Sequence, residues 1–216
     1  MRSRTPRLAL LAAAAALLAV PPVADSVARH RAEGRLADRL VREQPSLTAR
    51  PDVSIEGTPF LLQAARGSHP QVRVRADATS DGRPVTAEVT LDDVSPQGGG
   101  HRAASASGRF TAGYDALGGP DGATVSDAGD GRLRIERSLL MVTAVVELHD
   151  GVVSLRPTAV SLAGRPLDPA GPLVTRSLAG RTRTLPELPL EMRATGVSAG
   201  PDGITVTASA KDVALA

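Results

Sequence analysis

Residues 139–162 read LLMVTAVVELHDGVVSLRPTAVSL, two apolar runs on either side of Asp150-Gly151. An Asp-Gly pair between two such runs is a strong signal for a β-hairpin with a tight turn. The run Leu139–Leu148 is apolar on both of its alternating faces, whereas a half-exposed strand would alternate with polar residues. We therefore predict a hairpin whose first strand is covered on both sides.

The stretches around this hairpin show the two-residue period of strands with one buried and one exposed face. The clearest are Val72–Ala76, Val85–Leu91 and Ile204–Ala210, where apolar residues alternate with polar ones. Turn-forming clusters of Gly, Pro and Asp separate them, and the chain shows no linker or repeat. This pattern predicts one domain built on a long antiparallel sheet.

Three helices are expected to cover that sheet. Residues 27–43 are amphipathic, with apolar residues recurring every four positions, and Pro45 ends them. Thr58 as N-cap and Pro59 in the first turn predict a short apolar helix that Gly67 ends, and a third helix is predicted over Pro172–Leu178. The fold class is therefore α+β: a single domain with a highly curved antiparallel sheet wrapped on an N-terminal helix and short helices.

The N-terminus has the pattern of a targeting segment. Three arginines precede an uncharged stretch, Leu8–Ala24, whose strongly apolar part is shorter than a typical membrane span. Small residues at Ser26-Val27-Ala28 suit a signal peptidase, so residues 1–28 are either a signal peptide or a membrane anchor. Both readings place residues 29–216 outside the cytoplasmic membrane, in the cell envelope, because positive charge keeps the start of the chain inside.

Composition excludes several classes of partner. The net charge of +2 comes from the targeting segment, since 22 basic and 23 acidic residues remain once residues 1–24 are set aside. With three aromatic residues, the chain lacks the stacking platforms of single-strand nucleic-acid binders, so we expect no nucleic-acid partner. Without cysteine it has no disulfides and no thiolate metal site.

No group of residues suggests catalysis, a metal or a cofactor. The four histidines are widely separated, and residues 127–131 lack the alternating oxygen ligands of a calcium loop. Glu187 and Glu191 flank a Leu-Pro turn that would hold them in water, and no nucleophile has a base nearby in sequence. We predict a protein that is not an enzyme, with an exported enzyme as a minor alternative.

The segment from Val53 to Gln63, VSIEGTPFLLQ, together with Gly67 and the strand Val72-Arg73-Val74, resembles the hallmark of the actinobacterial LmeA-like phospholipid-binding family. Further matching pieces follow in order: residues 114–117 (YDAL), the hairpin around Asp150-Gly151, and residues 185–190 (LPELPL) leading into 202–206 (DGITV). The resemblance covers about residues 30–216. Thr58 departs from the pattern, because an aromatic residue is common there.

This resemblance implies a fold similar to half of a tubular lipid-binding (TULIP-like) module, with acyl chains in an apolar groove. It also implies phospholipid and a membrane surface as partners, and a role in building envelope lipoglycans. The residues expected to line the groove are Phe60, Leu61, Leu62, Leu140, Val142, Val146 and Leu148. Arg181 and Arg183, beside the proline-rich turn, are the candidates for headgroup phosphate, which a guanidinium matches well.

Each of these residues also has an ordinary structural reading. An apolar side chain can simply fill the core, and an arginine can simply face solvent. The alternative function is therefore a structural or scaffolding envelope protein whose groove is filled by its own side chains.

Overall fold

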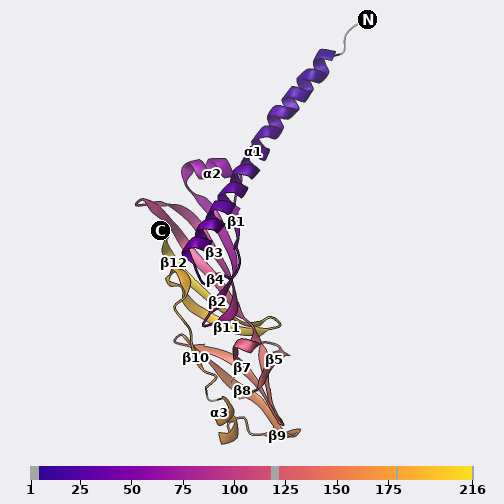
Figure 1. Cartoon of the computed structure of the whole chain (residues 1–216), viewed down its shortest axis with the longest axis vertical. Coiled ribbons are helices and arrows are strands. Elements are labelled where there is room, and N and C mark those ends of the chain that lie inside the picture. Colours follow the sequence, from indigo (N-terminus) through magenta and orange to yellow (C-terminus); the bar gives the residue numbers. More distant parts are fainter. Residues whose placement is uncertain (1–4, 118–121, 179, 216) are drawn as a thin grey trace.

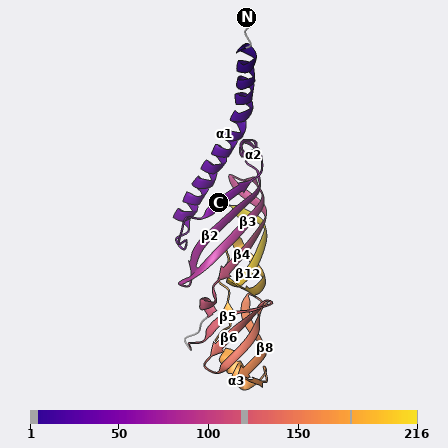
Figure 2. The same cartoon turned by 90° about the vertical axis from the view of Figure 1, so that its right-hand side faces the viewer.

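The structure is a computed structural model that describes the backbone of residues 5–117, 122–178 and 180–215. Side chains are described from residue 23 onward, except at residues 116, 117, 173 and 177 and in the gaps between those ranges. Helix α1 (Thr5–Glu43) ends just before Pro45, as predicted, but extends further toward the N-terminus than the predicted residues 27–43. Its first half projects away from the rest of the molecule (Figures 1 and 2). Within the part of the chain described in full, no helix is long and apolar enough to cross a membrane.

The strands form two antiparallel sheets where the sequence predicted one. The first sheet has the order β1-β2-β3-β4-β12-β11, and the second has the order β10-β8-β7-β6-β5 with β9 paired to β8. Figure 1 shows the two sheets one after the other along the long axis of the molecule. The α+β class, the antiparallel pairing and the single domain are confirmed.

The bounds of the elements show how the chain moves between the sheets. The first sheet contains β1 (Asp52–Glu56), β2 (His69–Ser80), β3 (Arg83–Gln97), β4 (Gly100–Ala112), β11 (Arg193–Gly200) and β12 (Gly203–Leu215). The second contains β5 (Thr124–Gly129), β6 (Arg132–Arg137), β7 (Leu140–His149), β8 (Val152–Leu162), β9 (Arg165–Leu167) and β10 (Arg183–Thr184). The helical elements after α1 are α2 (Phe60–Arg66), η1 (Tyr114–Leu117), α3 (Pro172–Leu178) and η2 (Pro189–Glu191). The second sheet is therefore an insertion between β4 and β11.

Local sequence explains the hairpins. Asp150 and Gly151 have φ angles of 49° and 76°, which is the left-handed pair that a two-residue hairpin turn requires. The predicted hairpin is thus confirmed as β7–β8. The prediction that its first strand is covered on both faces is wrong: Met141 is 39% exposed and Leu139, just before the strand, is 68% exposed. Val142 and Ala144 are buried, so β7 is a strand with one buried face.

Each sheet has its own apolar cluster. In the first, the inner face of α1 between Ala28 and Leu40 packs with Phe60 against the first sheet. In the second, α3 packs through Val174 against the second sheet, and Ala199 and Ile204 from the ends of β11 and β12 join it. Because β11 and β12 contribute to the second cluster while Ala208 and Val213 of β12 belong to the first, these strands connect the two halves.

The first sheet is distorted along one row that crosses its strands. Asp93 on β3 and Asp212 on β12 both have positive φ, of 50° and 58°, and both stand across from Ala104 of β4 without any shift in register. Along each of the three strands, the last inward-facing residue before the row and the first one after it are three positions apart, where a regular strand would have two. These pairs are Leu91 and Val94 on β3, Ala103 and Ala106 on β4, and Ala210 and Val213 on β12. The extra residue in each strand would exchange its two faces if the alternation continued unbroken. The left-handed aspartates lie at this break, and Val94 and Val213 after them still face the buried side of the sheet.

Candidate functional site

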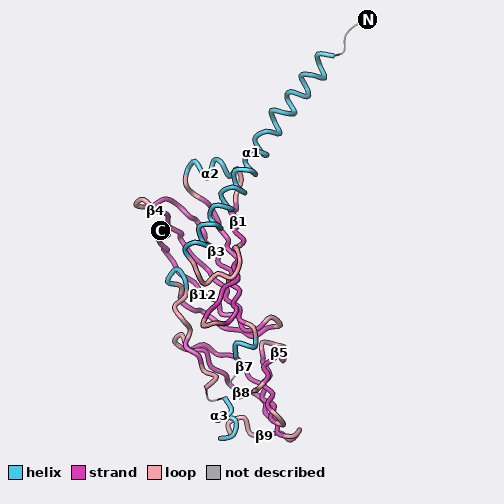
Figure 3. The backbone as a smooth tube through the Cα atoms, in the orientation of Figure 1, coloured by secondary structure: helices cyan, strands magenta, loops and turns pink. Residues whose placement is uncertain are grey.

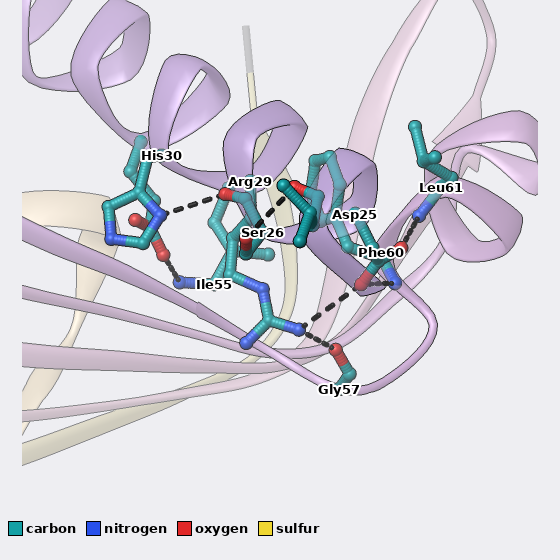
Figure 4. Close-up of polar contacts among 10 residues, drawn as sticks. Asp25, Ser26, Arg29, His30, Ile55, Gly57, Phe60 and Leu61 are labelled. Atoms are coloured by element: carbon teal, nitrogen blue, oxygen red, sulfur yellow. Dashed lines mark hydrogen bonds and ion pairs between the residues drawn. The ribbon is translucent and has the colours of Figure 1, made fainter. Parts of the chain in front are cut away.

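The junction between α1 and α2 is held by a carboxylate from α1 (Figure 4). Asp25 accepts the backbone N–H of Phe60 at 2.9 Å and that of Leu61 at 2.8 Å, so it satisfies two free donors at the start of α2. Arg29, one turn further along α1, lies 3.8 Å from Asp25 and donates to the Gly57 carbonyl at 2.7 Å. The prediction of Thr58 as N-cap is wrong: Pro59 occupies that position and no side chain local to α2 caps it.

The loop before α2 explains two residues of the 53–63 motif. Gly57 has a φ of 106°, and a Cβ there would lie 2.2 Å from the end of the Gln63 side-chain amide. The Gln63 amide lies within hydrogen-bonding distance of the Glu56 carbonyl and the Thr58 N–H. Glu33 of α1 accepts the N–H of Ile55 at 3.0 Å. The motif therefore forms a closed loop that α1 holds through an acid or arginine at every fourth position: Asp25, Arg29 and Glu33.

Two groups at this junction titrate abnormally. The backbone N–H groups of Leu61 and Phe60 lower the pKa of Asp25 below its ordinary value of 3.8. Burial lowers the pKa of His69 below 6.5, and the charge of His101 adds to this. The His69 ring stacks on Phe60 with ring centroids 5.7 Å apart. The anionic form of Asp25 and the neutral form of His69 are thus favoured by the folded state.

An open groove lies at the edge of the first sheet, between η2 and the last part of β12. Strand β11 begins opposite Ser209, so β12 beyond that residue pairs only with β4. Figure 3 shows the short η2 turn beside this unpaired edge. The groove has a volume of about 700 Å³, which is within the range of small-molecule sites. It is lined by Leu190, Glu191, Arg193, Thr195, Ser209, Ala210, Lys211, Asp212, Val213 and Ala214.

The groove connects the outer surface to the apolar interior. Val213 is buried in the first cluster, and Leu190 and Ala210 pack against that cluster. Arg193 and Lys211 are exposed at the outer side. A shallower depression of about 450 Å³ lies between the end of α1 and residues 47–50, and the ion pair between Arg50 and Asp38 lies at it. The groove beside β12 is therefore an opening that leads to the buried apolar side chains of the first cluster.

Most of the left-handed non-glycine residues that lie outside hairpin turns are found at this groove. Among the described residues other than glycine, five with positive φ are hairpin-turn residues: Asp81, Asp130, Ser138, Asp150 and Ala163. The others are Asp93, Leu190, Glu191 and Asp212, and the last three line the groove. Two consecutive left-handed residues in η2 are costly, and such strain is commonly found at functional sites.

The structure separates the apolar residues predicted to line one groove. Phe60 is 5% exposed in the first cluster, whereas Leu61 and Leu62 are each 47% exposed on the outside of α2. Leu140, Val142 and Val146 belong to the second cluster, and Leu148 is half-buried on β7. The seven residues are thus divided between two halves of the molecule, and their contact with lipid stays a prediction.

The two predicted headgroup arginines differ in accessibility. Arg181 is 5% exposed, while Arg183 is exposed on β10 and donates to the Gly180 carbonyl at 2.6 Å. Neither lines the groove beside β12. Sequence reasoning did not find Asp25, Arg193 or Lys211. Two signals in the sequence pointed to the groove. The apolar-polar alternation of the last strand breaks at Asp212-Val213, and the proline-rich segment 185–190 leads into η2.

The first half of the molecule thus combines a sheet with an apolar inner face and an open groove at the edge of that sheet. The family model for LmeA-like phospholipid-binding proteins matches residues 23–209, so the chain belongs to the LmeA-like phospholipid-binding family. The match includes Asp25 and reaches Ser209 at the groove. Neither a curated protein nor a solved structure matches the chain significantly.

Proposed function

We propose that this protein is an exported, non-enzymatic phospholipid-binding protein of the cell envelope that holds acyl chains against the inner face of the first sheet. Membership of the phospholipid-binding family supports the ligand class. The observation that carries the location is the set of half-buried apolar residues that pack against the first cluster. It includes Val74, Val89, Leu91, Phe110, Leu188, Leu190 and Leu215.

The second half of the molecule is less suitable for a ligand. Leu133, Val142 and Val174 are below 2% exposure, so this cluster is already filled by its own side chains. In the first half, Phe110 lies flat on the sheet because Gly108 has no Cβ, which would otherwise be 2.7 Å from the ring. An acyl chain that covered the half-buried residues there would gain roughly 0.8 kcal/mol for each buried methylene.

The N-terminal helix supports a location at the membrane. The charged and apolar pattern of residues 2–20 is typical of export, and α1 continues without a break into the helix that packs on the first sheet. Because Asp25 binds the start of α2 and Arg29 binds the loop before it, we infer that the helix stays attached and tethers the domain to the outer side of the membrane. A tethered lipid-binding domain is suited to moving phospholipid toward envelope lipoglycan assembly.

Lipid extraction and mass spectrometry of the purified full-length chain test this function. A phospholipid-binding protein should carry copurifying phospholipid in a fixed ratio to protein after extensive washing. A structural protein with a self-filled core would carry none above the level of a similarly purified protein with no lipid site. That second result would overturn the proposed function.

A further inference from the structure

We propose that the groove between η2 and β12 binds a phospholipid, with Arg193, Ser209 and Lys211 holding the phosphate and the acyl chain passing around the edge of β12 onto the inner face. This inference rests on the proposed function and adds the position of the headgroup and the route of the chain.

The three polar residues lie on one face of the sheet. Ala208 and Ala210 of β12 point into the first cluster. Because side chains alternate along a strand, Ser209 and Lys211 point to the opposite, outer face. Arg193 is the cross-strand partner of Ser209 and shares its face. A diagonal pair on neighbouring strands is about 7–8 Å apart, which is within reach of two long side chains that meet at one phosphate. The Ser209 hydroxyl can donate between them.

The charges at the groove suit an anion. Among the residues that the structure describes, neither Arg193 nor Lys211 takes part in an ion pair. Asp212 pairs with Arg102 at 2.5 Å, so its charge is already offset. Glu191 reduces the positive charge of the groove without cancelling it, since two cations remain. Charge-assisted bonds from guanidinium and ammonium groups to phosphate oxygens are stronger than neutral ones.

The free edge of β12 gives the acyl chain its route. Leu190 and Val213 lie on the inner side of the groove and belong to or pack on the first cluster. A chain that leaves a phosphate at Lys211 therefore meets apolar side chains as soon as it turns around the edge. The η2 turn contributes Leu190 and Glu191, both left-handed, to the wall of the groove along this route.

The test is calorimetric titration of the full-length chain with dioctanoyl phosphatidylglycerol, a short-chain anionic phospholipid that dissolves as a monomer. The double variant R193Q/K211Q should bind at least tenfold more weakly, which corresponds to about 1.4 kcal/mol. Ala214→Trp, which fills the groove from an exposed position, should also weaken binding. The control R165Q/R176Q removes two exposed cations from the other half and should bind like the wild type. Unchanged melting temperatures show that each variant is folded.

The outcomes separate the two proposals. If the wild-type chain binds no phospholipid, the proposed function itself fails. If it binds and both groove variants bind equally well, the function stands and the groove is not its site. Weakening by A214W alone, or equal weakening by both double variants, would overturn the assignment of the phosphate to Arg193 and Lys211.

Discussion

The carboxylate of Asp25 accepts the backbone N–H of Phe60 at 2.9 Å, although 35 residues separate them in the chain. This contact joins the N-terminal helix to the motif at residues 53–63. An N-cap residue normally lies next to its helix and accepts the free N–H groups of the first turn. Asp25 has this role for α2 from a distant part of the chain. The start of the domain therefore depends on a residue that lies before the expected boundary at residue 28.

Asp25→Ala should lower the melting temperature and speed amide exchange at Phe60 and Leu61, because two N–H groups lose their acceptor. Asp25→Asn should have a smaller effect, since one oxygen acceptor remains. Asp38→Ala is the matched control, because Asp38 is an exposed acid of α1 that pairs with Arg50 at the surface. Equal melting temperatures for the Asp25→Ala and Asp38→Ala variants would contradict this role.

The mature chain should retain Asp25. Cleavage after Ala28 would remove the acceptor for the Phe60 and Leu61 N–H groups and leave Arg29 without its acidic neighbour. Mass spectrometry of the protein isolated from its own host should therefore find an N-terminus at or before Asp25. A mature chain that begins at Arg29 would show that the junction is dispensable.

Phe60→Ala should destabilise the fold by about 3–5 kcal/mol, as expected for truncation of a buried phenylalanine. Its ring is buried between the first cluster and His69. Leu61→Ala, at the neighbouring exposed position, should change stability by only about 0.5 kcal/mol. Urea unfolding of the two variants measures the loss of unfolding free energy in each. Similar losses would contradict the assignment of Phe60 to the interior and Leu61 to the surface.

Gly57→Ala should destabilise the junction for two separable reasons, the positive φ and the overlap with Gln63. In the double variant Gly57→Ala with Gln63→Ala the overlap disappears while the backbone strain remains. The added Gln63→Ala change should therefore cost less than it does in the wild type. A double-mutant cycle of thermal unfolding gives this coupling, and strict additivity would rule out the proposed overlap.

Acid should loosen the α2 region in two steps. The pKa of His69 is lowered by burial, so the folded state resists its protonation and stability begins to fall as the pH drops below 6.5. The pKa of Asp25 is also lowered, so its contribution is present above 3.8 and is lost as the pH falls through the lower folded-state value. Amide exchange of residues 60–66 across this range follows both steps.

His69→Gln should abolish the first of these steps and leave the second, because glutamine does not titrate. Persistence of the step near pH 6.5 in this variant would assign it to another group. Glu147 also has a lowered pKa, through its hydrogen bond with Arg156, but it lies on β7 in the other half. Exchange measured at α2 itself therefore distinguishes Asp25 from Glu147.

Much of the local structure could be predicted from particular residues. The alternation in Val85–Leu91 and Ile204–Ala210 predicted strands that are present in β3 and β12. Gly67, with a φ of 68°, ends α2 as expected. The error over β7 arose because Met141 and Val145 were taken as evidence of burial, while a surface strand tolerates isolated apolar residues.

The sequence by itself determined the strands, the hairpin turns, the short helices and the family, because period, turn chemistry and a contiguous motif are all local properties of the chain. Only the tertiary structure decided that Asp25 would cap α2, that the strands would divide into two sheets, and that Arg193, Ser209 and Lys211 would share one face. The physical reason is that each of these depends on which distant backbone groups meet. The hydrogen bonds, burial and charged neighbours of a side chain depend on which segments the fold brings together, and not on its position in the sequence.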